Sequence, residues 1–271
     1  MCPSALTQDE RLRYARTMIL PDVGEEGQYR LKAASVLLIG AGGLGSSVAM
    51  HLAAAGIGRI GIVDPDTVEI SNLQRQVIHH MGMIGRLKVE SARQQLSCLN
   101  PHVRVETHTE CFSSRNADEI SAGYEILVDG TDNFHTRYLI NNLCVRAGKT
   151  YVYGALYRFE GQISVFDARK GPCYQCLYPE PPSMDVVANA SQAGIFSVLP
   201  GIVGTMQAAE ALKLILGIGT PLLGRLLLYD ALHVSFQEVR LSKDPGCKIC
   251  GTKPQRTRLA DHQADEHDPS G

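Results

Sequence analysis

Short apolar runs alternate with amphipathic segments through roughly the first half of the chain. Short apolar runs are typical of strands buried on both faces of a sheet, and they occur within residues 35–40, 59–64 and 125–130. Residues 102–109 alternate apolar and polar side chains, as a strand with one buried face does. Helical segments lie between these strands at 41–56, 87–100 and 133–148, with a short helix after Ser114. This alternation predicts a doubly wound, mostly parallel α/β sheet.

The pattern differs at the two ends of the chain. Residues of about 7–32 form a helical part, in which Thr7 and Glu10 make a capping box and Pro21 ends the first helix. Beyond residue 150 come a long helix at 204–217 and strand-like segments at 150–157, 161–167, 225–230 and 233–241. We expect these strands to extend the same sheet in antiparallel fashion, because no Ser/Gly linker precedes them. The prediction is one domain over 1–251 and a disordered tail over 252–271.

Composition and charge exclude several classes of protein. The chain has 271 residues, 44% of them hydrophobic and 20% charged, which predicts a globular core. A formal net charge of −2 offers no basic footprint for nucleic acid or an anionic membrane. The first twenty residues mix charges throughout and contain no secretion signal, so we expect a cytoplasmic protein.

The sequence GAGGLG at residues 40–45 fits the G-x-G-x-x-G pattern at a strand-to-helix turn. Glycines such as Gly42 and Gly43 let the backbone approach a phosphate, which the helix N-terminus attracts. Asp64 ends the next strand, where a carboxylate can bind ribose hydroxyls. The motif predicts a Rossmann-like nucleotide site, although a dehydrogenase would share it.

Basic and amide side chains follow this glycine loop. The segment SNLQRQ contains Ser71, Asn72 and Arg75, and Lys88 begins the following helix. Each cation alone could be a solvated surface charge. Together with a nucleotide loop they favour a triphosphate, whose negative charge exceeds that of a nicotinamide dinucleotide.

A polar group also follows the third apolar strand. Thr131, Asp132 and Asn133 lie where ligands bind in open α/β sheets, beyond the carboxyl end of a strand. A carboxylate among phosphates indicates Mg²⁺, so Asp132 is a candidate magnesium residue. An N-cap role for Asp132 is an alternative that is compatible with the first.

Four of the eight cysteines form two C-x-x-C pairs, Cys173 with Cys176 and Cys247 with Cys250. Turn-forming Gly and Pro residues flank both pairs, and each pair can present two thiolates to one tetrahedral ion. A redox dithiol is an alternative for either pair alone. The presence of two matched pairs predicts a closed, structural zinc site with four cysteine ligands.

Taken in order, these motifs resemble the MoeB/ThiF (HesA/MoeB/ThiF) family over about residues 12–251. The matching segments are RYARTMIL, GAGGLGS, VDPDTVEISNLQRQ, KVESA, GTDN, CYQCLYP, AEALKLILG and GCKICG. The resemblance implies an adenylyltransferase that uses ATP and Mg²⁺. Its substrate would be the C-terminal Gly-Gly carboxylate of a small β-grasp sulfur-carrier protein similar to MoaD or ThiS, which is thereby prepared for thiocarboxylate formation.

The resemblance also implies roles for individual residues. It implies a homodimer in which Arg16 reaches the neighbour's ATP. It implies that Gly43 lies against the nucleotide and that Asp64 binds the ribose. It further implies that Asn72, Arg75 and Lys88 contact the phosphates and that Asp132 works with magnesium.

Residues of about 178–194 match the family's crossover loop, over which a carrier's tail would pass. Ala190 occupies the position where the family places a cysteine, so a covalent transfer step there is not expected. The alanine is either natural or an engineered replacement. We also expect a separate protein to donate sulfur, because no sulfurtransferase domain follows Gly251.

Three alternatives remain at this point. The same chemistry could activate another carboxylate, such as a short peptide or a pathway-specific carrier. A dehydrogenase would explain the glycine loop but not SNLQRQ, Lys88 or the cysteine pairs. A scaffold that binds a carrier without activating it would not explain the presence of Asp64, Arg75, Lys88 and Asp132.

Overall fold

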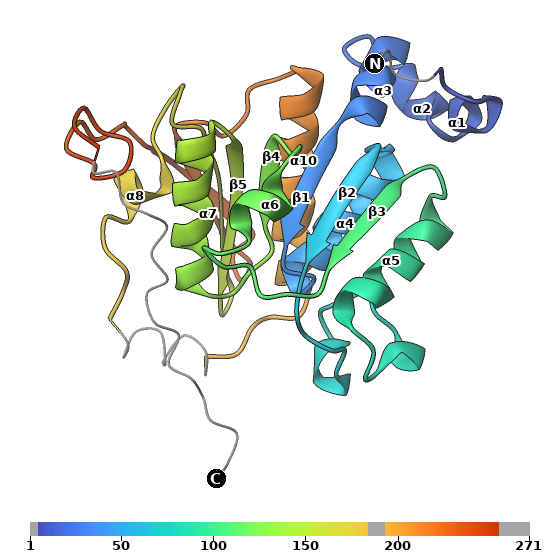
Figure 1. The fold of residues 1–271 in the computed structure, drawn as a ribbon, viewed down its shortest axis with the longest axis horizontal. Helices are drawn as coiled ribbons and strands as arrows, with labels where there is room; N and C mark the ends of the chain where they lie inside the picture. The colour runs from blue at the N-terminus through green and yellow to red at the C-terminus, as the bar shows by residue number, and fades with distance from the viewer. Residues whose placement is uncertain (1–4, 184–192, 255–271) are drawn as a thin grey trace.

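The apolar runs at 35–40, 59–64 and 125–130 form the centre of an eight-stranded sheet with the order β3-β2-β1-β4-β5-β6-β7-β8 (Figure 1). The structure is a computed structural model that describes residues 5–183 and 193–254. Its strands are β1 (Ser35–Ile39), β2 (Arg59–Val63), β3 (Arg104–His108), β4 (Ile126–Asp129), β5 (Thr150–Tyr157), β6 (Glu160–Phe166), β7 (Arg225–Asp230) and β8 (Ser235–Arg240). Strands β1 to β5 pair in parallel, whereas β6, β7 and β8 are added antiparallel. The predicted mixed sheet is confirmed.

Helices cover both faces of this sheet. The helical elements are α1 (Gln8–Arg13), α2 (Ala15–Met18), α3 (Gly24–Ala33), α4 (Gly43–Ala55), η1 (Ile70–Asn72), η2 (Met81–Met83), α5 (Lys88–Leu99), α6 (Ala117–Ser121), α7 (Phe134–Ala147), α8 (Tyr174–Leu177) and α10 (Leu199–Leu216). One hydrophobic cluster joins the sheet to α4, α5 and α10, and a second joins it to α6, α7 and α8. The sheet is therefore doubly wound, as the βα alternation predicts.

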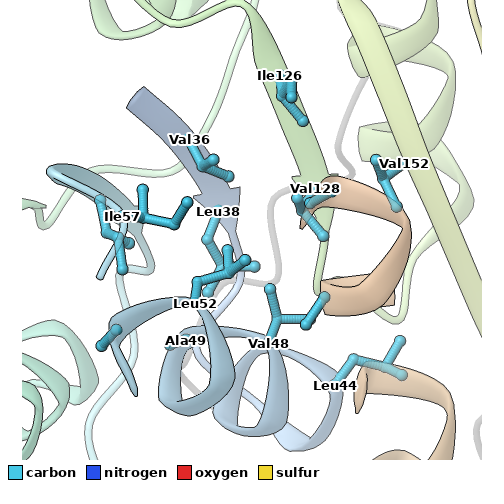
Figure 2. Packing of buried hydrophobic residues seen from close by; sticks show 14 of the residues in the cluster. Val36, Leu38, Leu44, Val48, Ala49, Leu52, Ile57, Ile126, Val128 and Val152 are labelled. Atoms are coloured by element: carbon cyan, nitrogen blue, oxygen red, sulfur yellow. The ribbon is translucent and has the colours of Figure 1, made fainter. Parts of the chain in front are cut away.

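The side chains of β1 divide between these two clusters. Val36 and Leu38 point toward α4 (Figure 2), whereas Leu37 belongs to the cluster beneath α7. Successive side chains of a strand point to opposite faces, and here both faces are buried. Each fully buried aliphatic side chain of this kind contributes about 1.5–3 kcal/mol relative to an exposed one. This central strand therefore fixes the loop that follows it.

The capping box of Thr7 and Glu10 is present, but the first helix does not run unbroken to Pro21. It divides into α1 and α2 at Tyr14, whose backbone (φ −96°, ψ 5°) leaves the helical region. The Tyr14 ring is buried and its hydroxyl accepts a hydrogen bond from the Asn100 amide at 2.8 Å. A long-range contact thus overrides the local helical pattern.

Two predicted helix starts were also wrong. The helix α6 begins after Asn116 rather than after Ser114, because residues 114–116 form a turn, in which the Asn116 side chain accepts from the Ser113 amide at 2.8 Å. The helix predicted at 204–217 begins earlier, at Leu199. Pro200 lies in its first turn, where the missing N–H costs no hydrogen bond.

Helix α10 is, within the described ranges, the helix long and apolar enough to cross a membrane, yet half of it is buried inside this protein. It packs on α4 and on β5 and β6 as part of the core. Most of the predicted crossover loop, including Ala190, and nearly all of the predicted tail lie outside the described residues.

Candidate functional site

The glycine loop connects β1 to α4 at the point where the strand order reverses, between β1 and β4. A Cβ atom added to Gly45 would lie 2.0 Å from the carbonyl oxygen of Gly40, and one added to Gly43 would lie 2.8 Å from Pro200 Cβ. The turn therefore requires glycine at these positions. Open α/β sheets bind their ligands at this switch point, beyond the carboxyl ends of the strands.

Asp64 lies at the end of β2 and holds the glycine loop in place. Its Oδ2 accepts from the Ala41 amide at 2.7 Å, and its Oδ1 accepts from the Asp66 amide at 2.9 Å. Burial raises the pKa of Asp64, and these two amide donors oppose the shift. The carboxylate predicted to bind ribose is thus anchored to the loop predicted to bind phosphate.

Lys88 is the first residue of α5 and is directed to the same edge of the sheet. Its Nζ lies 2.7 Å from Asp66 Oδ2, and its amide donates to the Asp66 carbonyl oxygen at 2.8 Å. The lysine side chain is only 9% exposed, whereas the Asp66 side chain is 63% exposed. The cation is therefore fixed by a partner that solvent can reach.

The segment after β2 places Asn72 and Arg75 beside the glycine loop. Asn72 is buried in η1, and its Oδ1 accepts from the Glu69 amide at 3.1 Å. The Nη1 of Arg75 donates to the carbonyl oxygen of the exposed Ser71 at 3.1 Å. The Arg75 side chain also passes within 3.7 Å of the point where a Gly43 Cβ would lie.

The loop after β4 lies against the glycine loop from the other side. A Cβ added to Gly40 would lie 3.2 Å from the Thr131 amide nitrogen, and the Thr131 hydroxyl donates to the buried Asp129 at 2.7 Å. The N-cap of α7 is Asn133, whose side chain accepts from the Thr136 amide at 2.8 Å. The alternative that Asp132 caps this helix is therefore wrong. Asp132 is exposed at the edge of the site.

Replacing the cap residue should cost more stability than replacing its neighbour. We expect Asn133→Ala to lower the free energy of unfolding by about 1 kcal/mol, because it leaves an N-terminal amide of α7 without its partner. Asp132→Ala is the matched control and should change the free energy by less than about 0.5 kcal/mol. Urea unfolding of both variants measures the difference, and equal losses would contradict the assignment of the cap.

Among the described residues, Arg16 is a predicted site residue that the structure places away from the glycine loop. It is exposed on α2, next to Tyr14, which packs at the C-terminal ends of α4 and α5. The glycine loop lies at the opposite end of α4, whose 13 residues span about 20 Å. Figure 1 shows α1 to α3 at the end of the sheet where β1 begins. Arg16 therefore lies at the opposite end of α4 from the glycine loop of its own chain.

Arg137 is a buried charged residue that the sequence analysis missed. Its Nε lies 3.5 Å from Asp129 Oδ2, and its Nη2 donates to the Thr131 carbonyl oxygen at 3.2 Å. The Tyr151 hydroxyl donates to the same carboxylate oxygen at 2.7 Å. This buried ion pair fixes the Thr131 loop to α7. A lone arginine in a helical pattern normally indicates an exposed side chain, so nothing in the sequence marked it.

The two C-x-x-C pairs come together although they are 74 positions apart. The Sγ of Cys173 lies 3.7 Å from that of Cys247, and the Sγ of Cys176 lies 3.4 Å from that of Cys250. All four sulfur atoms lie within 4.8 Å of one another. With Zn–S bonds of about 2.3 Å, tetrahedral ligands lie roughly 3.8 Å apart, so this arrangement fits one zinc ion.

The electrostatics of the cluster also suit a cation. Burial raises the pKa of Cys173, and it raises the pKa of Cys250 to about 11. At Cys247 burial acts in the same direction, but amide donors from Cys250 and Ile249 outweigh it and lower the pKa. Four sulfur atoms this close together, on three buried cysteines and the half-buried Cys176, cannot all ionise unless a cation compensates their charge.

The cysteine cluster is connected to the nucleotide side of the molecule through α7. The Tyr174 amide donates to Asn141 Oδ1 at 2.9 Å, and the Tyr174 ring packs edge-on against Tyr138 at 5.2 Å. Both partners lie on α7, which begins just after Asp132. Figure 1 shows α8 beside the C-terminal loop on the far side of α7 from β1.

This fold and site define an α/β protein with a Rossmann-like glycine loop and a four-cysteine cluster that is compatible with a zinc site. The ThiF family model matches residues 14–249, and the chain belongs to the ThiF family. The family expected from the motifs is thus confirmed.

Two curated relatives and one solved structure illustrate the similarity. "Sulfur carrier protein adenylyltransferase" of Thermus thermophilus is 50% identical over 263 residues, which cover 95% of this chain and 97% of the relative. "Probable adenylyltransferase/sulfurtransferase MoeZ" of Mycobacterium tuberculosis is 48% identical over 264 residues. These residues cover 96% of this chain and 66% of the relative. These names confirm the expected enzyme class, an adenylyltransferase.

The crystal structure of MccB from E. coli with ATP has a TM-score of 0.80 and 23% identity. The likeness covers 92% of this chain and 76% of the MccB chain. At this identity the likeness shows that the two proteins share a fold, and substrate choice does not follow from a fold.

Proposed function

We propose that this protein adenylates the C-terminal Gly-Gly carboxylate of a small β-grasp sulfur-carrier protein, with ATP as co-substrate. The observation that carries the proposal is the convergence of the glycine loop, Asp64 and Lys88 at the switch point of the sheet. The names of both curated relatives support the activity, and the Thermus relative's name supports the substrate.

The chemistry needs positioning and charge neutralisation more than proton transfer. A carboxylate oxygen of the carrier attacks the α-phosphorus of ATP, the bond to the β-phosphate oxygen breaks, and pyrophosphate leaves. The attacking carboxylate is already ionised at neutral pH, so no general base is required. We assign the glycine loop, with Gly42 and Gly43, and Ser71, Asn72, Arg75 and Lys88 to the nucleotide and its phosphates, and Asp64 to the ribose.

Magnesium and zinc have separate roles in the proposal. Asp132 is exposed beside the glycine loop, with Thr131 and Asn133 adjacent, and would hold Mg²⁺. A bound Mg²⁺ would neutralise phosphate charge and orient the reacting phosphorus. The four cysteines would hold a structural zinc ion, with no ligand position left open for catalysis.

We propose a homodimer in which Arg16 serves the neighbour's site. The distance of Arg16 from the glycine loop of its own chain supports this arrangement. So does the apolar surface beside it, because Ile19 is 70% exposed and Leu20 is 53% exposed. A cytoplasmic location and a separate sulfur donor complete the proposal.

The alternative substrates are less well supported. Activation of a peptide carboxylate rests on likeness to MccB, which is a likeness of fold. A dehydrogenase leaves Lys88 and the cysteine cluster unexplained, and a non-catalytic scaffold leaves the charged groups at the switch point unexplained.

The test is pyrophosphate release on mixing the protein with Mg-ATP and a carrier ending in Gly-Gly. We expect release together with the mass of a carrier adenylate, and no release with the same carrier lacking its last glycine. Carrier binding without ATP consumption would replace the proposal with the scaffold. Tight NADH binding without ATP binding would replace it with the dehydrogenase.

A further inference from the structure

His79 is a buried residue between η1 and η2 to which the proposed chemistry assigns no role. Both of its ring nitrogens lie at hydrogen-bond distance from specific partners. Nδ1 lies 2.8 Å from the hydroxyl oxygen of Ser91 on α5, and Nε2 lies 3.0 Å from the carbonyl oxygen of Ala41 in the glycine loop. One imidazole ring therefore bridges the two elements that carry the phosphate-binding groups.

The partners determine the protonation state of the ring. A carbonyl oxygen only accepts, so Nε2 must carry the proton that it donates to Ala41. Burial lowers the pKa of His79, and nearby Lys88 and His80 act in the same direction. The neutral ring then accepts at Nδ1 from the Ser91 hydroxyl, and both buried nitrogens are satisfied.

The bridge closes a ring of interactions around the loop. On the other side of Ala41, its amide donates to Asp64, and Asp64 accepts from the Asp66 amide. Asp66 in turn binds Lys88, which lies one helical turn before Ser91 on α5. Ala41 is thus held through its amide and its carbonyl, and both connections lead to the same helix.

We propose that His79 is a positioning residue. It holds the glycine loop and helix α5, which begins at Lys88, in a fixed position relative to each other, so that both can contact the phosphates of ATP. It acts through the Ala41 carbonyl and the Ser91 hydroxyl and does not touch substrate. The inference rests on the proposed use of ATP but not on the identity of the carrier.

Two substitutions separate the two contacts. In His79→Asn the side-chain amide nitrogen can occupy the place of Nδ1 and keep Ser91, but the bond to Ala41 is lost. In His79→Gln the longer side chain can place its amide nitrogen near Nε2 and keep Ala41. We expect His79→Asn to raise the Kd for Mg-ATP and the KM for ATP about tenfold with kcat changed less than about threefold. His79→Gln should stay within about threefold of the unmodified protein. His102→Gln, at an exposed pair with Asp9, is the control.

A purely structural role would give a different result, because both variants would lose stability and total activity together without a separation of KM from kcat. An unchanged Kd for Mg-ATP in folded His79→Asn would overturn the proposal. Should the variants not fold, two-bond ¹H–¹⁵N NMR of the unmodified protein still tests it, since a proton on Nδ1 alone would exclude the bridge. Mg-ATP binding without carrier adenylation would count against the proposed function and leave this inference standing.

Discussion

Lys88→Ala should reduce ATP–pyrophosphate exchange by about 10²–10³-fold while the protein stays folded. In the proposed function, Lys88 neutralises charge that develops on the phosphates, and the loss of one such group typically costs about 2.7–4 kcal/mol of transition-state stabilisation. Folding should be affected much less, because its partner Asp66 is 63% exposed and would be solvated once unpaired. Exchange kinetics and urea unfolding of the same preparation measure the two effects.

Lys149→Ala is the matched control for this prediction. The Nζ of Lys149 donates to the Ser121 and Tyr124 carbonyl oxygens at 2.9 and 2.6 Å, so this lysine is also held by the fold. It immediately precedes β5 and therefore lies at the amino end of the parallel strands, away from the glycine loop. Its replacement should leave exchange within about twofold. Full exchange activity in folded Lys88→Ala would refute the assignment of Lys88.

The double variant Cys247→Ser/Cys250→Ser should lose bound zinc and much of its stability. The two remaining cysteines cannot complete a tetrahedral site, and structural zinc sites contribute on the order of 10 kcal/mol to folding in isolated zinc-finger peptides at neutral pH. We expect about one zinc ion per chain in the unmodified protein and almost none in the variant. Elemental analysis measures the zinc, and thermal unfolding measures a loss of several kcal/mol.

Cys98 and Cys111 provide the control, because both are exposed and lie outside the four-cysteine cluster. Changing both to serine should leave zinc content and the unfolding temperature unchanged. Equal zinc in the unmodified protein and in the Cys247→Ser/Cys250→Ser variant would rule out this site.

The sequence by itself determined the local chemistry of this protein. Strands that are buried on both faces consist mainly of apolar residues, so the apolar run that begins at Ser35 predicted a central strand of the sheet. The glycine loop was also visible, because a turn this tight excludes a side chain at Gly45. The spacing of the cysteine pairs that begin at Cys173 and Cys247 predicted a metal site, because two thiolates three residues apart can bind one ion. These features depend on residues that are neighbours in the chain.

Only the tertiary structure decided which residues meet. It placed Asn133 rather than Asp132 at the start of α7, and it removed Arg16 from the site of its own chain. It also buried Arg137 and His79, whose partners come from other elements. The physical reason is that burial and hydrogen-bond partners are set by packing between distant segments, which no local pattern records.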